Sequence, residues 1–188
     1  AFRKCTRLLT AHIPDSVTTI DPAAFGECTS LSVVSLSSNL TTLGASAFHN
    51  CDNLTSITLP KTIENIPSTQ MYDYPSMTYG AVFAECDNLK NVYFEDGTIT
   101  IHQIMNRCNS IESITVPATV TEIGYKAFQN CTSLKTVDIP DSVVAIQSAA
   151  FGGCTKLTDV VLPPNLTTLG SSAFHNCDGL TEITLPKR

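Results

Sequence analysis

The sequence contains no tryptophan, 7% aromatic residues and 15% charged residues. No run of apolar residues approaches the roughly eighteen that a membrane-spanning helix requires, so we expect no membrane insertion by this segment. Basic residues are also few, because eleven Lys and Arg stand against seventeen Asp and Glu, for a net charge of −6. A scattered basic minority argues against a nucleic-acid-binding protein, which needs clustered cations for the phosphates.

The usual signatures of catalytic and metal sites are missing as well. The sequence has no Gly-x-Ser-x-Gly, no Walker loop, no His-Glu-x-x-His and no dinucleotide-binding fingerprint. Its cysteines include no Cys-x-x-Cys pair of the kind found in structural zinc sites. His49 and His175 occupy the same repeat position, several units apart, so they are not expected to converge. We expect no catalytic residue, no metal and no cofactor, and we predict that the chain is not an enzyme.

Eight cysteines divide the 188 residues into units of nearly constant length. Successive cysteines are 23, 23, 35, 22, 23, 23 and 23 residues apart, which is a fixed period with one insertion. Such a period indicates a solenoid, in which each unit buries its apolar side chains only by stacking on its neighbours. We expect residues 1–188 to form a single domain of about eight repeats with an insertion at 67–78. Because both ends fall inside the repeat pattern, we also expect a fragment of a longer protein, or open ends that meet other copies.

Each repeat has two halves with different periodicities. After the cysteine, apolar residues alternate with polar ones, as at Val137 and Ile139, which predicts a short strand that a proline such as Pro140 often ends. Before the cysteine, Ala and Cys lie four residues apart, which predicts a short helical turn with a neighbouring Phe facing inward. These phenylalanines are expected to stack as a spine with centroids roughly 4.5–7 Å apart. Its members are Phe25, Phe48, Phe83, Phe128, Phe151 and Phe174.

The repeat resembles a known family. Leu-x-x-Ile-x-Leu-Pro, as at Leu54–Pro60, joined to Ile-Gly-x-x-Ala-Phe-x-x-Cys, as at Ile123–Cys131, is similar to the 23-residue leucine-rich repeat of BspA-like surface proteins. The resemblance covers the whole chain and implies an α/β solenoid, a right-handed leucine-rich-repeat horseshoe. It further implies a short-stranded parallel sheet on the concave face, short helical turns on the opposite side, and adhesion or protein recognition at a cell surface or outside the cell. Two places depart from the pattern, namely Ile104-Met105 in place of Ala-Phe and Phe94-Glu95 in place of an aliphatic residue and Pro.

The eight cysteines are expected to be buried free thiols. Residues at one repeat position lie in a line along a solenoid and point the same way, so they do not converge in pairs. Adjacent units can nevertheless bring Cα atoms within the roughly 4.4–6.8 Å that a disulfide requires. Distance alone therefore leaves bridges between neighbouring units open as an alternative.

The outward residues of the predicted strands, the fifth and seventh after each cysteine, are free for recognition. Asn91 and Tyr93 stand near the middle of the stack, and Tyr93 is the one aromatic residue among them. Asp138, Asp159 and Glu182 make the last three units acidic, which favours a basic partner. The alternative is a solvated face whose scattered charge only keeps the open sheet soluble.

The insertion concentrates residue types that are common at interface cores. It contributes a candidate binding loop, unless it folds back and buries the same side chains as a local core. With the adjoining tyrosine, the candidate contacts are Met71, Tyr72, Tyr74, Met77 and Tyr79.

The sequence therefore favours a non-enzymatic recognition or adhesion module that binds a protein ligand through the concave face and the insertion. The alternative is a structural element that self-associates by stacking through uncapped ends.

Overall fold

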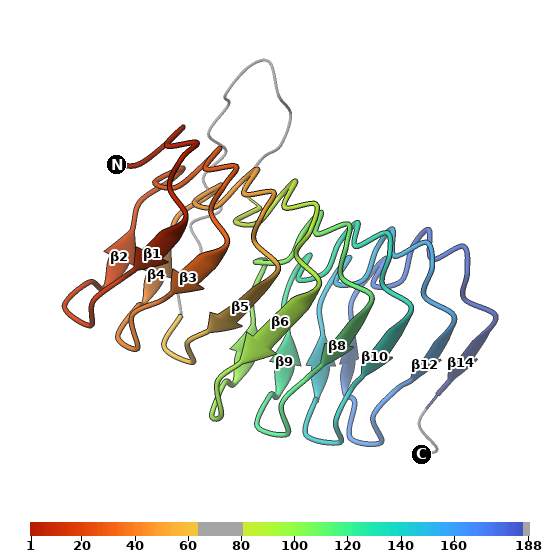
Figure 1. The fold of residues 1–188 in the computed structure, drawn as a ribbon. Helices are drawn as coiled ribbons and strands as arrows, with labels where there is room; N and C mark the ends of the chain where they lie inside the picture. The colour runs from red at the N-terminus through yellow and green to blue at the C-terminus, as the bar shows by residue number, and fades with distance from the viewer. Residues whose placement is uncertain (64–80, 186–188) are drawn as a thin grey trace.

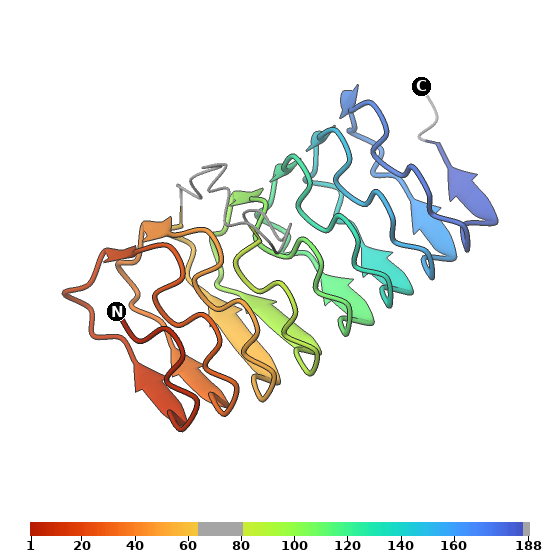
Figure 2. The ribbon, with the colours of Figure 1, turned by 90° about the horizontal axis from the view of Figure 1, so that it is seen from above.

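The computed structural model describes residues 1–63 and 81–185, which form a stack of similar coils. We number the coils 1 to 8 by their cysteines, from Cys5 to Cys177. Figures 1 and 2 show an elongated, gently twisted body in which successive coils lie side by side from one end to the other. The insertion at 67–78 lies outside the described residues.

Every strand in the described residues is short, and the strands form two lines along the stack. The long-strand line consists of β1 (Thr10–His12), β3 (Val33–Ser35), β5 (Ser56–Leu59), β6 (Asn91–Phe94), β8 (Ser113–Thr115), β10 (Thr136–Asp138), β12 (Asp159–Val161) and β14 (Glu182–Thr184). The short-strand line consists of β2 (Thr19–Ile20), β4 (Thr42–Leu43), β7 (Thr100–Ile101), β9 (Glu122–Ile123), β11 (Ala145–Ile146) and β13 (Thr168–Leu169).

All strand pairs are parallel and align equivalent residues of neighbouring coils. In the long-strand line the pairs are β1–β3, β5–β6, β8–β10 and β12–β14, whereas the short-strand line contains β2–β4 and the ladder β7–β9–β11–β13. The register is kept across the insertion, because Ser56 is aligned with Asn91 although they are 35 residues apart. The expected parallel solenoid of stacked coils is confirmed, and the long strands of coils 3 and 4 stay in register although 12 additional residues separate them.

The helical turns expected before each cysteine are absent from the part of the chain that the structure describes. The residue just before each cysteine has a positive φ in all eight coils, for example 62° at Glu27 and 60° at Asn130. A second positive φ occurs four residues earlier in most coils, for example 54° at Lys126. Because left-handed residues cannot continue a right-handed helix, the segment folds as successive tight turns.

Hydrogen bonding gives the physical reason for this difference. Alternate N–H groups of the turn segment leave their own coil: Phe25 donates to the carbonyl of Ala47 at 2.8 Å, and Glu27 donates to that of His49 at 2.7 Å. The intervening N–H of Gly26 donates within the turn, to Ala23 at 3.1 Å. In an α-helix all these donors would be used internally, so the coils would lose the backbone bonds that join them on this side.

The phenylalanine spine is confirmed and includes Phe2. Centroid separations between neighbouring coils are 5.2 to 5.4 Å, with rings inclined by 3° to 20°. Met105 takes the corresponding place in coil 5 and is completely buried. The spine therefore consists of two stacks of rings with a thioether between them, which suits a flexible side chain that fills irregular space.

The cysteines form a second buried line beside this spine. All eight are free, and all except Cys5 are buried. Seven thiols donate to a main-chain carbonyl of the preceding coil, at sulfur–oxygen distances of 3.0 to 3.6 Å. The accepting residue is the spine residue of that coil, such as Phe25 for Cys51 and Met105 for Cys131. Each buried cysteine thus fills apolar space in the core, and its thiol also donates a hydrogen bond to a main-chain carbonyl there.

Burial also makes these thiols poor nucleophiles. Desolvation raises the pKa of Cys131 to about 12. Desolvation likewise raises the pKa of Cys108 and Cys154. Because the thiolate is the reactive form, the buried line is inert at neutral pH.

Removing one ring from the middle of a stack should be costly. We expect Phe151→Ala to lower the free energy of unfolding by about 3–5 kcal/mol, because a completely buried side chain leaves a cavity between Phe128 and Phe174. Urea denaturation followed by circular dichroism measures the change. Tyr125→Ala, at an aromatic residue that is 54% exposed, is the control and should differ from wild type by less than about 0.5 kcal/mol. Equal effects of the two substitutions would contradict the stacked core.

Thiol counting tests the cysteine line. In the native protein one thiol, Cys5, should react with a chromogenic disulfide reagent within minutes, because Cys5 is exposed and the other seven are buried. All eight should react in denaturant. The substitution Cys5→Ser should remove the fast phase and leave seven slow thiols. A fast phase of several equivalents in native buffer is incompatible with this packing.

Candidate functional site

The outward residues of the long-strand line form a surface that we call the long-strand face. Most strands turn a residue inward between two outward residues, as in β8, where Ile114 is buried between the exposed Ser113 and Thr115, whereas all three residues of β14 are exposed. Because the strands pair in register, the outward side chains form two rows. One row contains Asn91, Ser113, Thr136, Asp159 and Glu182, and the other contains Tyr93, Thr115, Asp138, Val161 and Thr184.

A groove of about 320 Å³ opens on this face between coils 4 and 5. It lies at a junction where no strand pairing joins β6 to β8 within the residues that the structure describes. Tyr93 is 56% exposed on its wall. The lining residues are Asn91, Val92, Tyr93, Phe94, Asp96, Ser113, Thr115 and Pro117.

An irregular turn after β6 holds that strand on the side of coil 3. Where six of the other seven coils have Pro, this coil has Glu95, whose N–H donates to the carbonyl of Leu59 at 3.0 Å. The Glu95 carboxylate in turn accepts the N–H of Lys61 at 3.2 Å. Gly97 follows with a φ of 92°, a conformation that glycine adopts without strain. These bonds tie β6 to β5, and the turn presents Asp96 at the end of the groove.

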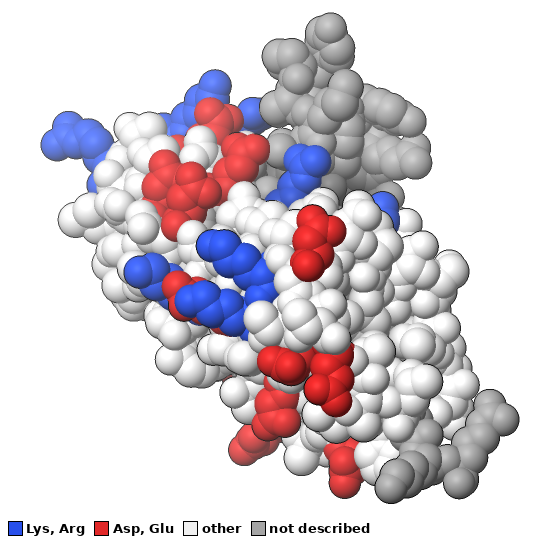
Figure 3. All heavy atoms as spheres, turned by 90° about the vertical axis from the view of Figure 1, so that its right-hand side faces the viewer, with Lys and Arg blue, Asp and Glu red and all other residues white. Residues whose placement is uncertain are grey.

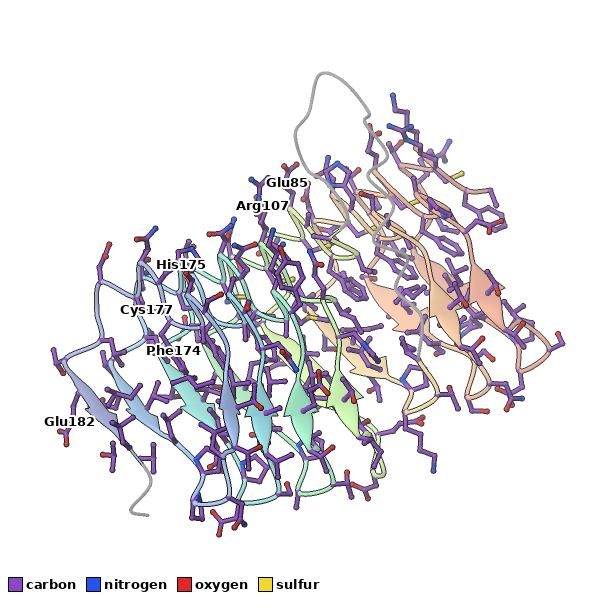
Figure 4. The ribbon with its side chains drawn as sticks, turned by 180° about the vertical axis from the view of Figure 1, so that it is seen from behind. Glu85, Arg107, Phe174, His175, Cys177 and Glu182 are labelled. Atoms are coloured by element: carbon purple, nitrogen blue, oxygen red, sulfur yellow. The ribbon has the colours of Figure 1, made fainter. Side chains whose placement is uncertain are left out.

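The charges of the long-strand face are unbalanced. Asp138, Asp159 and Glu182 are exposed, and Asp159 and Glu182 are register partners on neighbouring strands. No ion pair involves these three carboxylates among residues 1–63 and 81–185. Figure 4 shows Glu182 pointing away from the body of the stack.

Two acidic residues elsewhere pair with Lys or Arg. Glu27 pairs with Arg3 at 2.9 Å, and Glu112 pairs with Lys135 at 2.7 Å. The hydrogen bond from Lys135 and its charge lower the pKa of Glu112. In Figure 3, seen from the end at which β14 lies, the charged side chains gather in a few separate groups on a largely uncharged surface.

A comparison with family models identifies the repeat. Residues 1–81 and 76–188 match the model of the BspA type leucine rich repeat region, in six copies. The chain belongs to the BspA-type leucine-rich repeat family. No curated protein matches the sequence.

Several solved structures of bacterial leucine-rich repeat proteins share the BspA-type fold. A protein from Bacteroides ovatus is 25% identical with a TM-score of 0.69, and the match covers 97% of this chain and 50% of that one. A protein from Eubacterium ventriosum is 23% identical with a TM-score of 0.71, over 96% of this chain and 44% of that one. A leucine rich cell surface protein from Faecalibacterium prausnitzii is 23% identical with a TM-score of 0.53, over 98% and 55%. The chain thus spans about half the length of these proteins.

The structure brings some of the predicted site residues together. Asn91 and Tyr93 both line the groove, and Asp138 lies beside it, since it is the register partner of Thr115 on the groove wall. Asp159 and Glu182 continue the acidic surface over the last two coils. The predicted insertion contacts lie outside the described residues: Met71, Tyr72, Tyr74, Met77 and Tyr79.

Sequence reasoning missed Asp96 and Pro117 as groove residues, and it placed Ser113 and Thr115 only among the outward strand residues. The departure from the BspA-type pattern at Phe94-Glu95 was the available signal for Asp96, because an altered strand end implies a different turn. The other three occupy regular repeat positions. Among the described strands, pairing is also missing between β3 and β5 and between β10 and β12, so what distinguishes these three residues is the groove that opens at the β6–β8 junction.

A histidine and a serine also meet on the long-strand face. Nδ1 of His12 lies 3.2 Å from Oγ of Ser35, and both residues are exposed. A catalytic pair of this kind needs a third group that orients the imidazole and a pocket that holds substrate. The open sheet at β1 and β3 supplies a hydrogen bond between coils instead.

Residues 1–63 and 81–185 contain no group of three His, Cys, Asp or Glu side chains that could hold a metal ion. The same part of the chain has no helix long and apolar enough to cross a membrane.

Substitution of an exposed groove residue should affect stability much less than substitution of a neighbouring core residue. We expect Tyr93→Ala to change the free energy of unfolding by less than about 0.5 kcal/mol, because the ring is largely exposed. Val92→Ala, one residue away and 8% exposed, should cost about 1.5–3 kcal/mol by loss of burial. Urea denaturation compares the two variants. If Tyr93→Ala is as costly as Val92→Ala, the ring is a packing element and not a free recognition group.

Proposed function

We propose that this chain is a protein-recognition or adhesion module of a cell-surface protein, and that it binds another protein through the long-strand face around the Tyr93 groove. The observation that carries the proposal is the exposed Tyr93 ring on the wall of a groove lined by both short polar and apolar side chains. Tyrosine is enriched in the buried centres of protein interfaces, because its ring offers a large contact area at low entropic cost.

The separate roles of the inward and outward residues of the strands support a binding role. The inward residues are used for packing, as with Ile57 and Val160, which are 2% exposed. The outward residues have no such role, so they can vary without loss of the fold. Because backbone bonds and a continuous core hold the strands, the outward side chains are presented on a rigid surface, which lowers the entropy lost on binding.

Placement at the cell surface rests on relatives. The leucine rich cell surface protein of Faecalibacterium prausnitzii shares the fold, and the family is named for a surface-protein repeat. The resemblance stated above implies the concave side of a horseshoe as the binding side, and we assign that role to the long-strand face. A second contact through the Tyr/Met-rich insertion, and self-association through the end coils, stay predictions.

Site-specific photo-cross-linking tests the proposal. With benzoylphenylalanine in place of Tyr93, illumination in the presence of intact cells should give a discrete adduct with a protein, because the ring sits at the contact. The matched control carries the same residue in place of Tyr125, which is similarly exposed but lies outside the long-strand face. An adduct from position 93 that is absent from position 125 supports the proposal. Equal labelling from both positions, or labelling from neither, contradicts it.

A further inference from the structure

The groove also indicates what kind of partner it accepts, an inference that rests on the proposed function. We propose that it binds a positively charged side chain, an arginine, on an extended segment of the partner protein, and that this segment continues across the acidic strands toward β14.

The first support is the set of groups that line the groove. It offers two aromatic side chains, Tyr93 and Phe94, one carboxylate, at Asp96, and the amide and hydroxyls of Asn91, Ser113 and Thr115. No Lys, Arg or His is among the lining residues. A groove without cations does not suit a phosphate, a sulfate or an acidic peptide, because each would be desolvated beside a carboxylate.

The second support is the charge beside the groove. Tyr93, Thr115 and Asp138 occupy the same repeat position on β6, β8 and β10, so a group above Thr115 lies between an aromatic ring and a carboxylate. A guanidinium fits this arrangement: its plane stacks on tyrosine, and its N–H groups can donate to Asp138. The stem and Nζ of Lys61 lie beside Gly97, which follows the groove residue Asp96, so we place the second cation at the Asp138 side.

The third support is the unpaired acidic surface that follows. Asp159 and Glu182 are adjacent in register, at the roughly 4.8 Å spacing of strands. Like charges directly opposite one another on a sheet are destabilising. Among the described residues neither has an ionic partner, whereas Glu27 and Glu112 do. A basic segment would supply the missing countercharge.

The geometry sets the length of that segment. Four strand spacings separate β6 from β14, which is at least about 19 Å, because among the described strands no pairing joins β6 to β8 or β10 to β12. An extended chain covers roughly 3.3 Å per residue, so a segment of at least about six residues is needed to reach from Tyr93 to Glu182. Alternate side chains of an extended peptide point the same way. Three basic residues at alternate positions can therefore make three contacts in turn: the first with Tyr93 and Asp138, the second with Asp159 and the third with Glu182.

The test uses a defined probe and the whole chain. The probe is a fluorescein-labelled peptide, Gly-Arg-Gly-Arg-Gly-Arg-Gly, and the matched probe has citrulline, a neutral isostere, in place of each arginine. Fluorescence anisotropy should show binding of the arginine peptide at least tenfold tighter than that of the citrulline peptide. We expect Tyr93→Ala and Asp138→Asn each to weaken binding of the arginine peptide at least fivefold.

A control variant with the same change of charge distinguishes binding at the groove from general attraction of a basic peptide to an acidic protein. Asp178→Asn removes the same charge at an exposed residue outside the long-strand strands, and it should leave affinity within twofold of wild type. Equal binding of the two peptides, or equal weakening by Asp138→Asn and Asp178→Asn, overturns the assignment of a cationic partner. If the peptide-binding test fails but position 93 still cross-links to a protein, protein recognition stands and the partner has a different chemistry. If the cross-link from position 93 is absent as well, the proposed function is rejected.

Discussion

Backbone hydrogen bonding between equivalent residues of neighbouring coils is the constraint on which the rest of this structure depends. Strand pairs such as Val137 with Ile114 keep identical repeat positions side by side, and the turn segment adds bonds of the same kind through alternate N–H groups. Each coil therefore needs a neighbour on both sides to satisfy its polar groups and to bury its apolar ones. Any residue type that suits one coil is consequently required again one period later.

The core shows how this constraint selects side chains. Phenylalanine repeats because rings stacked at 5.2 to 5.4 Å fill the spacing between coils. Cysteine repeats because the carbonyl of the spine residue points into the core, where a small apolar side chain with a weak donor can reach it, as Cys154 reaches Phe128 at 3.2 Å. The cysteines are thus packing residues, and their even number has no connection with disulfide pairing.

Departures from the period are where the molecule gains individual features. Met105 replaces a ring in coil 5, and Glu95 with Asp96 and Gly97 replaces the usual end of a strand in coil 4. Both changes adjoin the junction between β6 and β8, where the groove opens. A solenoid tolerates such changes because each coil contacts only its neighbours, so a local irregularity alters one junction and leaves the remaining coils in register.

The sequence by itself determined the solenoid, the coil boundaries, the Phe spine and the inward or outward direction of each strand residue, because all of these follow from a period of 23 and an alternation of two. Only the tertiary structure decided that the segment before each cysteine is a chain of tight turns. The spacing of Ala and Cys suits a helix, but the N–H groups are bonded to the next coil. The tertiary structure also decided that Asp96, Ser113, Thr115 and Pro117 join Asn91 and Tyr93 around one groove. That grouping depends on how two neighbouring strands separate, and a separation between coils is a property of their packing that no single repeat encodes.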